Sequence, residues 1–128
     1  MKRLVILMLM WIAPFAMKAD VIDDIASAIR AGNAKEISKY FADQVDLKVL
    51  DQENIYSRAQ AEMIIKDFFV KHPVKGFVLV HRSVPKNDSR YAIGTLDTST
   101  GTYRVHYQIK TAGGKHSIMQ FRIENNNE

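Results

Sequence analysis

The histidines are the side chains of this chain best suited to metal binding or proton transfer. There are four, His72, His81, His106 and His116. None stands two or four residues from another, so the chain lacks the His-x-His and His-x-x-x-His spacings that hold a metal. It also contains no cysteine, which excludes thiolate metal sites, cysteine nucleophiles and disulfides. We therefore expect no metal, no cofactor and no catalytic residue that a motif identifies.

A basic stripe runs along the last two segments that alternate between apolar and polar residues. Its members share one face of the predicted strands: Arg104, His106, Gln108, Lys110, Gln120 and Arg122. Such a face can bind an acidic partner or a glycan, form a dimer interface, or be a solvated outer sheet face. It has no interleaved aromatic residues, so it does not predict a platform for single-stranded nucleic acid.

The first 19 residues have the parts of a secretion signal. Lys2 and Arg3 give a positive start, residues 4–13 are almost purely apolar, and Ala16 and Ala19 are small. An apolar run of about ten residues is too short for a bilayer, which needs about 20. We expect cleavage after Ala19, or alternatively after Ala16. The product would be an exported, periplasmic or secreted, single domain of residues 20–128 without a membrane anchor.

Removal of this signal changes the charge balance. The whole chain has 18 Lys and Arg against 14 Asp and Glu. Lys2, Arg3 and Lys18 lie in the signal, which has no acid, so 15 basic and 14 acidic residues remain and the net charge is +1. A nucleic-acid-binding domain needs a strongly basic face. The charge therefore predicts no nucleic-acid partner.

Apolar spacing predicts two helices at the start of the domain. Apolar residues at spacings of three and four indicate a helix over 20–31. Gly32 would end it, because glycine is the residue that most often follows the last turn of a helix. Asn33, with Glu36 three residues later, predicts the capped start of a second short helix. The apolar face of that helix would carry Ile37, Tyr40 and Phe41.

The remaining segments predict strands around one more helix. Alternation over 45–50 indicates a short strand, followed by a polar turn at 51–54. Ser57 and Gln60 predict the capped start of a helix that Pro73 ends. Strands are then expected over 76–84, 90–96, 102–111 and 115–124, with a turn at 86–89. This order indicates an α+β fold, with N-terminal helices packed on one face of a strongly curved antiparallel sheet.

The hairpin between the last two strands has two conflicting signals. Gly113-Gly114 favours a two-residue turn, which would set Tyr107 opposite Gln120 and mix buried with exposed residues. A three-residue loop of residues 113–115 would set Tyr107 opposite Phe121 and Ile109 opposite Met119. Because a slip of one residue exchanges the two faces of a strand, burial decides the register. We therefore predict the three-residue loop with a glycine bulge.

The two ends of the domain together resemble a known superfamily. The run from Val21 to Ile37, the pair Tyr40-Phe41 and the strand at 45–50 look like the opening of nuclear-transport-factor-2-like (cystatin-like) proteins. The segment from Tyr107 to Glu124 resembles their final hairpin. More narrowly, the chain is similar to a family of small exported bacterial proteins of undescribed function, domain of unknown function 4783.

That resemblance implies a cone with an internal pocket between three helices and a bent sheet. Tyrosines pointing into a cone would give it apolar walls with a few polar tips, the usual composition of a small-ligand site. We expect this pocket to be lined by Tyr40, Phe68, Tyr91, Tyr103, Tyr107, Met119 and Phe121. Members of the superfamily often pair through the outer sheet face, so a homodimer is a second expectation.

The superfamily also includes isomerases and dehydratases. Its isomerases use a carboxylate base in an apolar pocket beside a tyrosine or a protonated acid. Asp46 and Asp97 are the available bases, but Asp46 alternates with apolar neighbours and Asp97 opens a turn-like segment. We therefore predict a non-catalytic module that binds a small apolar or amphipathic ligand or a protein partner. An isomerase or dehydratase is the alternative.

Overall fold

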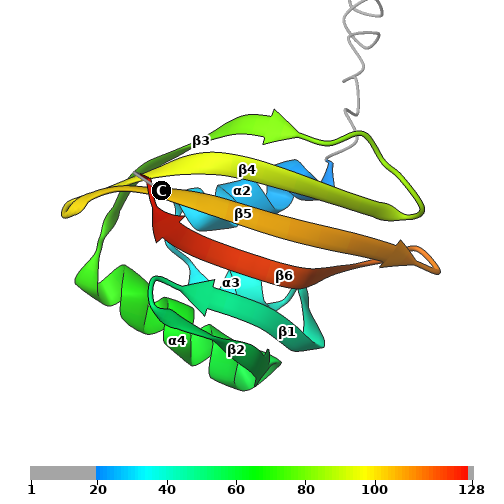
Figure 1. The fold of residues 1–128 in the computed structure, drawn as a ribbon, viewed down its shortest axis with the longest axis horizontal. Coiled ribbons are helices and arrows are strands. Elements are labelled where there is room, and N and C mark those ends of the chain that lie inside the picture. Colours follow the sequence, from blue (N-terminus) through cyan, green and yellow to red (C-terminus); the bar gives the residue numbers. More distant parts are fainter. Residues whose placement is uncertain (1–19, 127–128) are drawn as a thin grey trace, which may run out of the picture.

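The computed structural model describes residues 20–126 (Figure 1). The predicted secretion signal and its cleavage site lie outside the described residues. Within residues 20–126, no helix is both long and apolar enough to cross a membrane.

Two short helices open the domain, each with the cap that its sequence indicates. In α2 (Val21–Arg30), the carboxylate of Asp20 accepts a hydrogen bond from the Ile22 amide at 3.1 Å. In α3 (Ala34–Ser38), the Asn33 side chain accepts from the Glu36 amide at 3.1 Å. The second helix is shorter than predicted, because Phe41 begins a strand instead of extending a helical face.

A strand pair and a long helix follow. Strand β1 (Phe41–Val49) turns at Leu50, whose φ is +57°, into strand β2 (Gln52–Ser57). The prediction of a polar turn over 51–54 was therefore wrong. Strand β2 lies at the sheet edge with nearly every residue exposed, so it has no apolar alternation to reveal it. Helix α4 (Arg58–Lys71) starts with the predicted capping box of Ser57 and Gln60.

Four long strands complete the sheet. They are β3 (Val74–Arg82), β4 (Ser89–Thr98), β5 (Gly101–Ala112) and β6 (Lys115–Asn125). The order across the sheet is β2-β1-β6-β5-β4-β3. Strand β1 runs parallel to β6 and every other pair is antiparallel. The sheet is therefore mixed, not purely antiparallel as predicted, because the last strand inserts between the first strand and β5.

The helices share one side of the sheet, as Figure 1 shows. Helix α2 packs against β3 and β4, and α4 packs against β1 and β2. We call this helix-covered side the inner face and the opposite side the outer face. The α+β class and the arrangement of helices on one face of a curved sheet are confirmed.

The β5–β6 hairpin resolves its conflicting signals with a bulge. Gly113 and Gly114 form a two-residue turn with φ of +58° and +78°, so the predicted three-residue loop is wrong. Ile109 therefore pairs with Ile118, not with Met119. Between Gln108 and Ile109 the register shifts by one residue, which leaves Met119 as the extra residue of β6. Beyond that shift Tyr107 pairs with Phe121, as burial predicted.

Candidate functional site

The inner face of the sheet is packed with apolar side chains. Tyr107 and Phe121 are fully buried and stack at a centroid distance of 6.3 Å. Phe68 and Tyr103, also buried, meet edge to face at 5.3 Å. The Tyr107 hydroxyl donates a hydrogen bond to the Ile22 carbonyl at 2.8 Å, and burial raises the pKa of Tyr107. The hydroxyl proposed as a polar tip of a pocket is therefore bound within the core.

The other three residues predicted to line a pocket lie elsewhere. Tyr40 is half-buried at the margin of the core, and burial raises its pKa. Tyr91 is 36% exposed and lies on the outer face, because the inner face of β4 takes Ala92 and Leu96. Met119 is 40% exposed at the bulge of β6. The structure thus brings four of the seven residues together, in the core, and leaves three outside it.

The carboxyl groups considered as bases are not buried either. Asp97 is exposed on β4, and Asp46 is half-buried on β1, where the Gln120 amide donates to it at 3.4 Å. Among residues 20–126, no Asp or Glu is fully buried. The arrangement needed for an acid–base pair with a pocket tyrosine is therefore absent from the described residues.

A polar cluster closes one end of the core, and sequence reasoning missed it. His72, the C-cap of α4, has Nδ1 2.5 Å from the Thr100 hydroxyl and 3.3 Å from the Tyr103 hydroxyl. The β4–β5 turn supplies Thr100, which lies 28 residues away in the chain. A neighbouring hollow of about 150 Å³, lined in part by Phe68 and His72, is below the usual volume of a ligand pocket, about 300–1,000 Å³.

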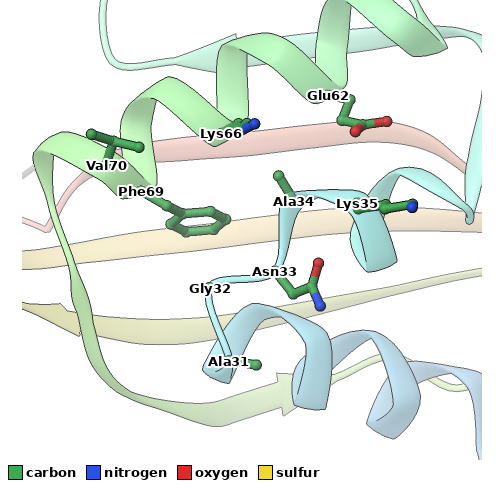
Figure 2. A pocket seen from close by; sticks show the side chains of 9 residues that line it. All are labelled: Ala31, Gly32, Asn33, Ala34, Lys35, Glu62, Lys66, Phe69 and Val70. Atoms are coloured by element: carbon green, nitrogen blue, oxygen red, sulfur yellow. The ribbon is translucent and has the colours of Figure 1, made fainter.

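A larger hollow of about 460 Å³ lies between the α2–α3 turn and α4 (Figure 2). Figure 2 shows the Phe69 ring reaching from α4 towards that turn, with Lys35 and Lys66 also among the lining residues. The Ser38 hydroxyl donates to Glu62 at 2.8 Å and so engages the acid of this hollow. Two of its four polar side chains, Asn33 and Glu62, already accept hydrogen bonds within the protein, from the Glu36 amide and the Ser38 hydroxyl. The hollow therefore gives a ligand few fixed polar partners.

The third hollow, of about 490 Å³, lies on the outer face of the sheet. Strands β3 to β6 supply its lining, since alternate residues of each strand point outward. The lining residues are Val80, His81, Ile93, Arg104, His106, Arg122 and Glu124. We call this the outer hollow. It gathers Arg104, His106 and Arg122 of the predicted stripe, whereas the rest of the stripe lies outside its lining.

The four histidines lie in three separate places. His81 and His106 line the outer hollow, with Tyr91 between them: its hydroxyl lies 3.3 Å from His81 Nε2, and its ring is 5.5 Å from that of His106. His116 is at the hairpin tip, where its Nδ1 lies 2.8 Å from the Thr111 hydroxyl. No group of three potential metal ligands occurs in the described part of the chain.

Glu124 is the electrostatic centre of the outer hollow. Its carboxylate oxygens lie 3.0 Å from Lys48 Nζ, 3.5 Å from an Arg104 nitrogen and 3.9 Å from an Arg122 nitrogen. The hydrogen bond from Lys48 lowers the pKa of Glu124, so this carboxylate is ionised at neutral pH. Arg122 also lies 3.3 Å from Glu53. Three cations therefore share one carboxylate.

His106 is the unusual residue of the outer hollow. Its Nδ1 is buried and has no hydrogen-bond partner among the described residues. Burial lowers the pKa of His106, and the neighbouring Arg122 adds to this effect. The imidazole is therefore neutral at pH 7. A buried polar atom without a hydrogen-bond partner is rare and destabilises the fold, so packing alone does not explain a histidine at this position.

Comparison with known proteins decides the family. Residues 22–124 match the family model described as Domain of unknown function (DUF4783). The chain belongs to the DUF4783 family. A DUF4783 protein from Bacteroides ovatus is 31% identical, with a TM-score of 0.76 over 82% of this chain and 94% of its own. One from Bacteroides uniformis is 30% identical, with a TM-score of 0.79 over 85% and 100%.

More distant structures identify the fold alone. A nuclear-transport-factor-2-like protein of unknown function from Cytophaga hutchinsonii is 8% identical to this DUF4783 chain, with a TM-score of 0.59 over 85% of this chain and 92% of its own. The predicted family is confirmed by the family-model match, and the predicted nuclear-transport-factor-2-like fold by this structural likeness. The curated proteins give no match.

The outer hollow of this DUF4783 protein was only partly predictable. Alternation along β5 and β6 placed Arg104, His106 and Arg122 on one face. The predicted stripe did not include Val80 of β3 or Ile93 of β4. The available signal for Ile93 was the outward alternation of Tyr91, Ile93 and Thr95 between small or apolar residues of β4.

Proposed function

We propose that this DUF4783 protein is an exported, non-catalytic binding module whose ligand site is the outer hollow. The observation that carries this proposal is the composition of that hollow. Val80 and Ile93 give it an apolar wall, and Arg104 and Arg122 give it a cationic wall. Its volume of about 490 Å³ lies within the usual range for small-ligand pockets. This composition suits a small amphipathic molecule.

The absence of catalysis in this proposal rests on the state of the titratable groups. The Tyr107 hydroxyl is bound to the Ile22 carbonyl. His106 is neutral and, within residues 20–126, no carboxylate hydrogen-bonds to its ring, so it lacks the partner that orients a general base. The groups of the outer hollow can hold a ligand, but they do not form an acid–base pair.

A fluorescent amphipathic probe tests the binding function. The single tryptophan lies at position 11, so the domain after the predicted cleavage contains none and gives little background. We expect 1-anilinonaphthalene-8-sulfonate to bind the folded domain with saturation at one site. Val80→Glu should weaken this binding at least tenfold because it places a charge on the apolar wall.

Val70→Glu is the control, because Val70 is also an exposed valine, at 70% against 61% for Val80, and lies on α4, away from the outer hollow. It should leave the probe affinity unchanged. Probe binding that does not saturate, or that falls equally in both variants, would overturn the proposal. A cooperative thermal transition in each variant shows that the domain remains folded.

Export is tested by the N-terminus of the product. Expression of the full chain in a bacterial host should give protein in the periplasm or medium that begins at Asp20, or at Met17 after the alternative cut. Intact-mass measurement distinguishes the two. Retention of Met1 in a cytoplasmic product would contradict export.

A homodimer through the outer face is a second candidate function. The observation that favours it is the exposure of Val78 and Val80, at 65% and 61%, two residues apart on the edge strand β3. Exposed apolar side chains grouped on one face often mark a contact surface. Sedimentation should then give twice the monomer mass at micromolar concentration, and Val78→Glu should restore the monomer.

A further inference from the structure

We propose that the outer hollow selects amphipathic carboxylates, and that Arg104 binds the carboxylate group. The inference rests on the proposed function, because it names the chemical class of ligand for the same site. The apolar part of the ligand would lie along Val80 and Ile93. The carboxylate would lie towards β5 and β6.

Arg104 has unused hydrogen-bonding capacity. Within residues 20–126, its side chain makes one polar contact, to Glu124 Oε1 at 3.5 Å. Charge-assisted hydrogen bonds of this kind are usually about 2.7–2.9 Å long, so the contact is weak. A guanidinium group carries five N–H donors in a planar fork that matches a carboxylate. The side chain is 39% exposed, so these donors are accessible.

Three cations compete for the Glu124 carboxylate. Lys48 Nζ lies closer to this carboxylate than Arg104 does, at 3.0 Å. Arg122 has a second acid, since Glu53 lies 3.3 Å away. Arg104 thus has a longer contact with Glu124 than Lys48 has and, unlike Arg122, no second acid among the described residues. A ligand carboxylate can supply a better partner without removing the contacts of Lys48 or Arg122.

The apolar wall and the cationic wall of the outer hollow are formed by different strands. Val80 and Ile93 come from β3 and β4, whereas Arg104 and Arg122 come from β5 and β6. The neutral His106 ring lies on β5 beside Ile93, its direct partner on β4. A ligand that satisfies both walls needs an apolar chain and one anionic end. A short anion gains little from the valine, and an alkylammonium ion is repelled by the arginines.

The experiment compares four probes of matched chemistry. Octanoate, 1-octanol, octylammonium and butyrate are titrated into the ¹⁵N-labelled domain, and amide shifts of β3 to β6 are followed by NMR. We expect octanoate to bind at least tenfold more tightly than any of the other three. Arg104→Gln should weaken octanoate at least tenfold and leave 1-octanol unchanged. Lys110→Gln, an exposed cation on the same strand outside the lining of the hollow, should change octanoate binding less than twofold.

The outcomes separate this inference from the proposed function. If octylammonium or 1-octanol binds the outer hollow as well as octanoate, the carboxylate preference is wrong and the binding function stands. If Arg104→Gln and Lys110→Gln have equal effects, the role of Arg104 is wrong. If neither the four probes nor 1-anilinonaphthalene-8-sulfonate binds with saturation, both proposals are wrong. Shifts confined to a dimer interface with a doubled mass would also overturn the carboxylate site.

Discussion

The inner and outer faces of the sheet come from the same strands but treat polar groups differently. On the inner face, the Tyr107 hydroxyl is bonded at 2.8 Å to a backbone carbonyl and the surrounding side chains are apolar. On the outer face, three cations share Glu124, and His106 Nδ1 has no partner in the described residues. The Tyr107 hydroxyl on the inner face is hydrogen-bonded within the protein, whereas the outer face retains polar groups that can bind a ligand. The alternation of the strands therefore gives the stabilising contacts of the core to one face and the proposed ligand site to the other.

The largest effect should come from deletion of a ring on the inner face. Tyr107→Ala removes a fully buried side chain and should lower the free energy of unfolding by about 3–5 kcal/mol. Tyr107→Phe loses only the bond to Ile22 and should cost about 1 kcal/mol. Urea denaturation measures both. Tyr91→Ala, the outer-face control, should cost less than Tyr107→Ala, and an equal cost would break the distinction between the faces.

A tight contact on the inner face gives the second prediction. A Cβ atom at Gly94 would lie 2.3 Å from Cζ of Phe77 and 2.8 Å from the Val78 carbonyl. Gly94→Ala should therefore push Phe77 out of place and cost about 1–3 kcal/mol in urea denaturation. Gly76→Ala has no neighbouring atom within 4 Å and serves as the control. Equal stability of the two variants would show that this face is loosely packed.

The outer face should respond more to pH than to packing. Because the pKa of Glu124 is lowered in the folded state, its carboxylate stabilises the domain above the ordinary value of 4.5. That stabilisation is lost as the pH falls below 4.5 through the folded pKa. Glu124→Gln should cost about 1 kcal/mol at pH 7 and flatten the acid limb of the stability profile. Glu53→Gln removes a more exposed ion pair, that of Glu53 with Arg122. It should therefore change the stability profile less than Glu124→Gln does.

The smallest effect concerns His106. Its pKa is lowered in the folded state, so the unfolded chain takes up a proton more readily. Stability is therefore full above the ordinary value of 6.5 and declines as the pH falls from 6.5 towards the folded pKa. His106→Gln should abolish this decline in thermal melts just below pH 6.5. His116→Gln, at the exposed hairpin tip, should preserve the wild-type profile. If His116→Gln removes the decline instead, its assignment to His106 is wrong.

The fold was predictable where burial leaves a periodic pattern. The isoleucines of α2, the capping residues Asn33 and Ser57, and the alternation of β5 all mark elements that the structure contains. Strand β2 was missed because nearly every residue of this edge strand is exposed, so no apolar alternation marks it. Phe41 was placed in a helix because its apolar side chain also fits the helical spacing.

The candidate site was harder to predict, because it depends on which strands become neighbours. The sequence placed the cations of β5 and β6 on one face, but it did not order the strands so that Val80 and Ile93 lie beside them. Tyr91 was assigned to a pocket from its residue type. The small residues Ala92 and Gly94 next to it, which pack on the inner face, were the better indication of its direction.

The bulge at Met119 sets a rule for how the length of this hairpin can change. On the turn side of Met119, even-numbered Ile118 of β6 points inward, and on the other side odd-numbered Phe121 and Ile123 do. Residues can be added to or removed from the tip in pairs, one on each strand, without altering which side chains enter the core. A single insertion or deletion within one strand turns the side chains of one segment to the opposite face of the sheet, unless the bulge moves or disappears at the same time. Relatives whose hairpins differ by an odd number of residues should therefore carry their bulge at another position.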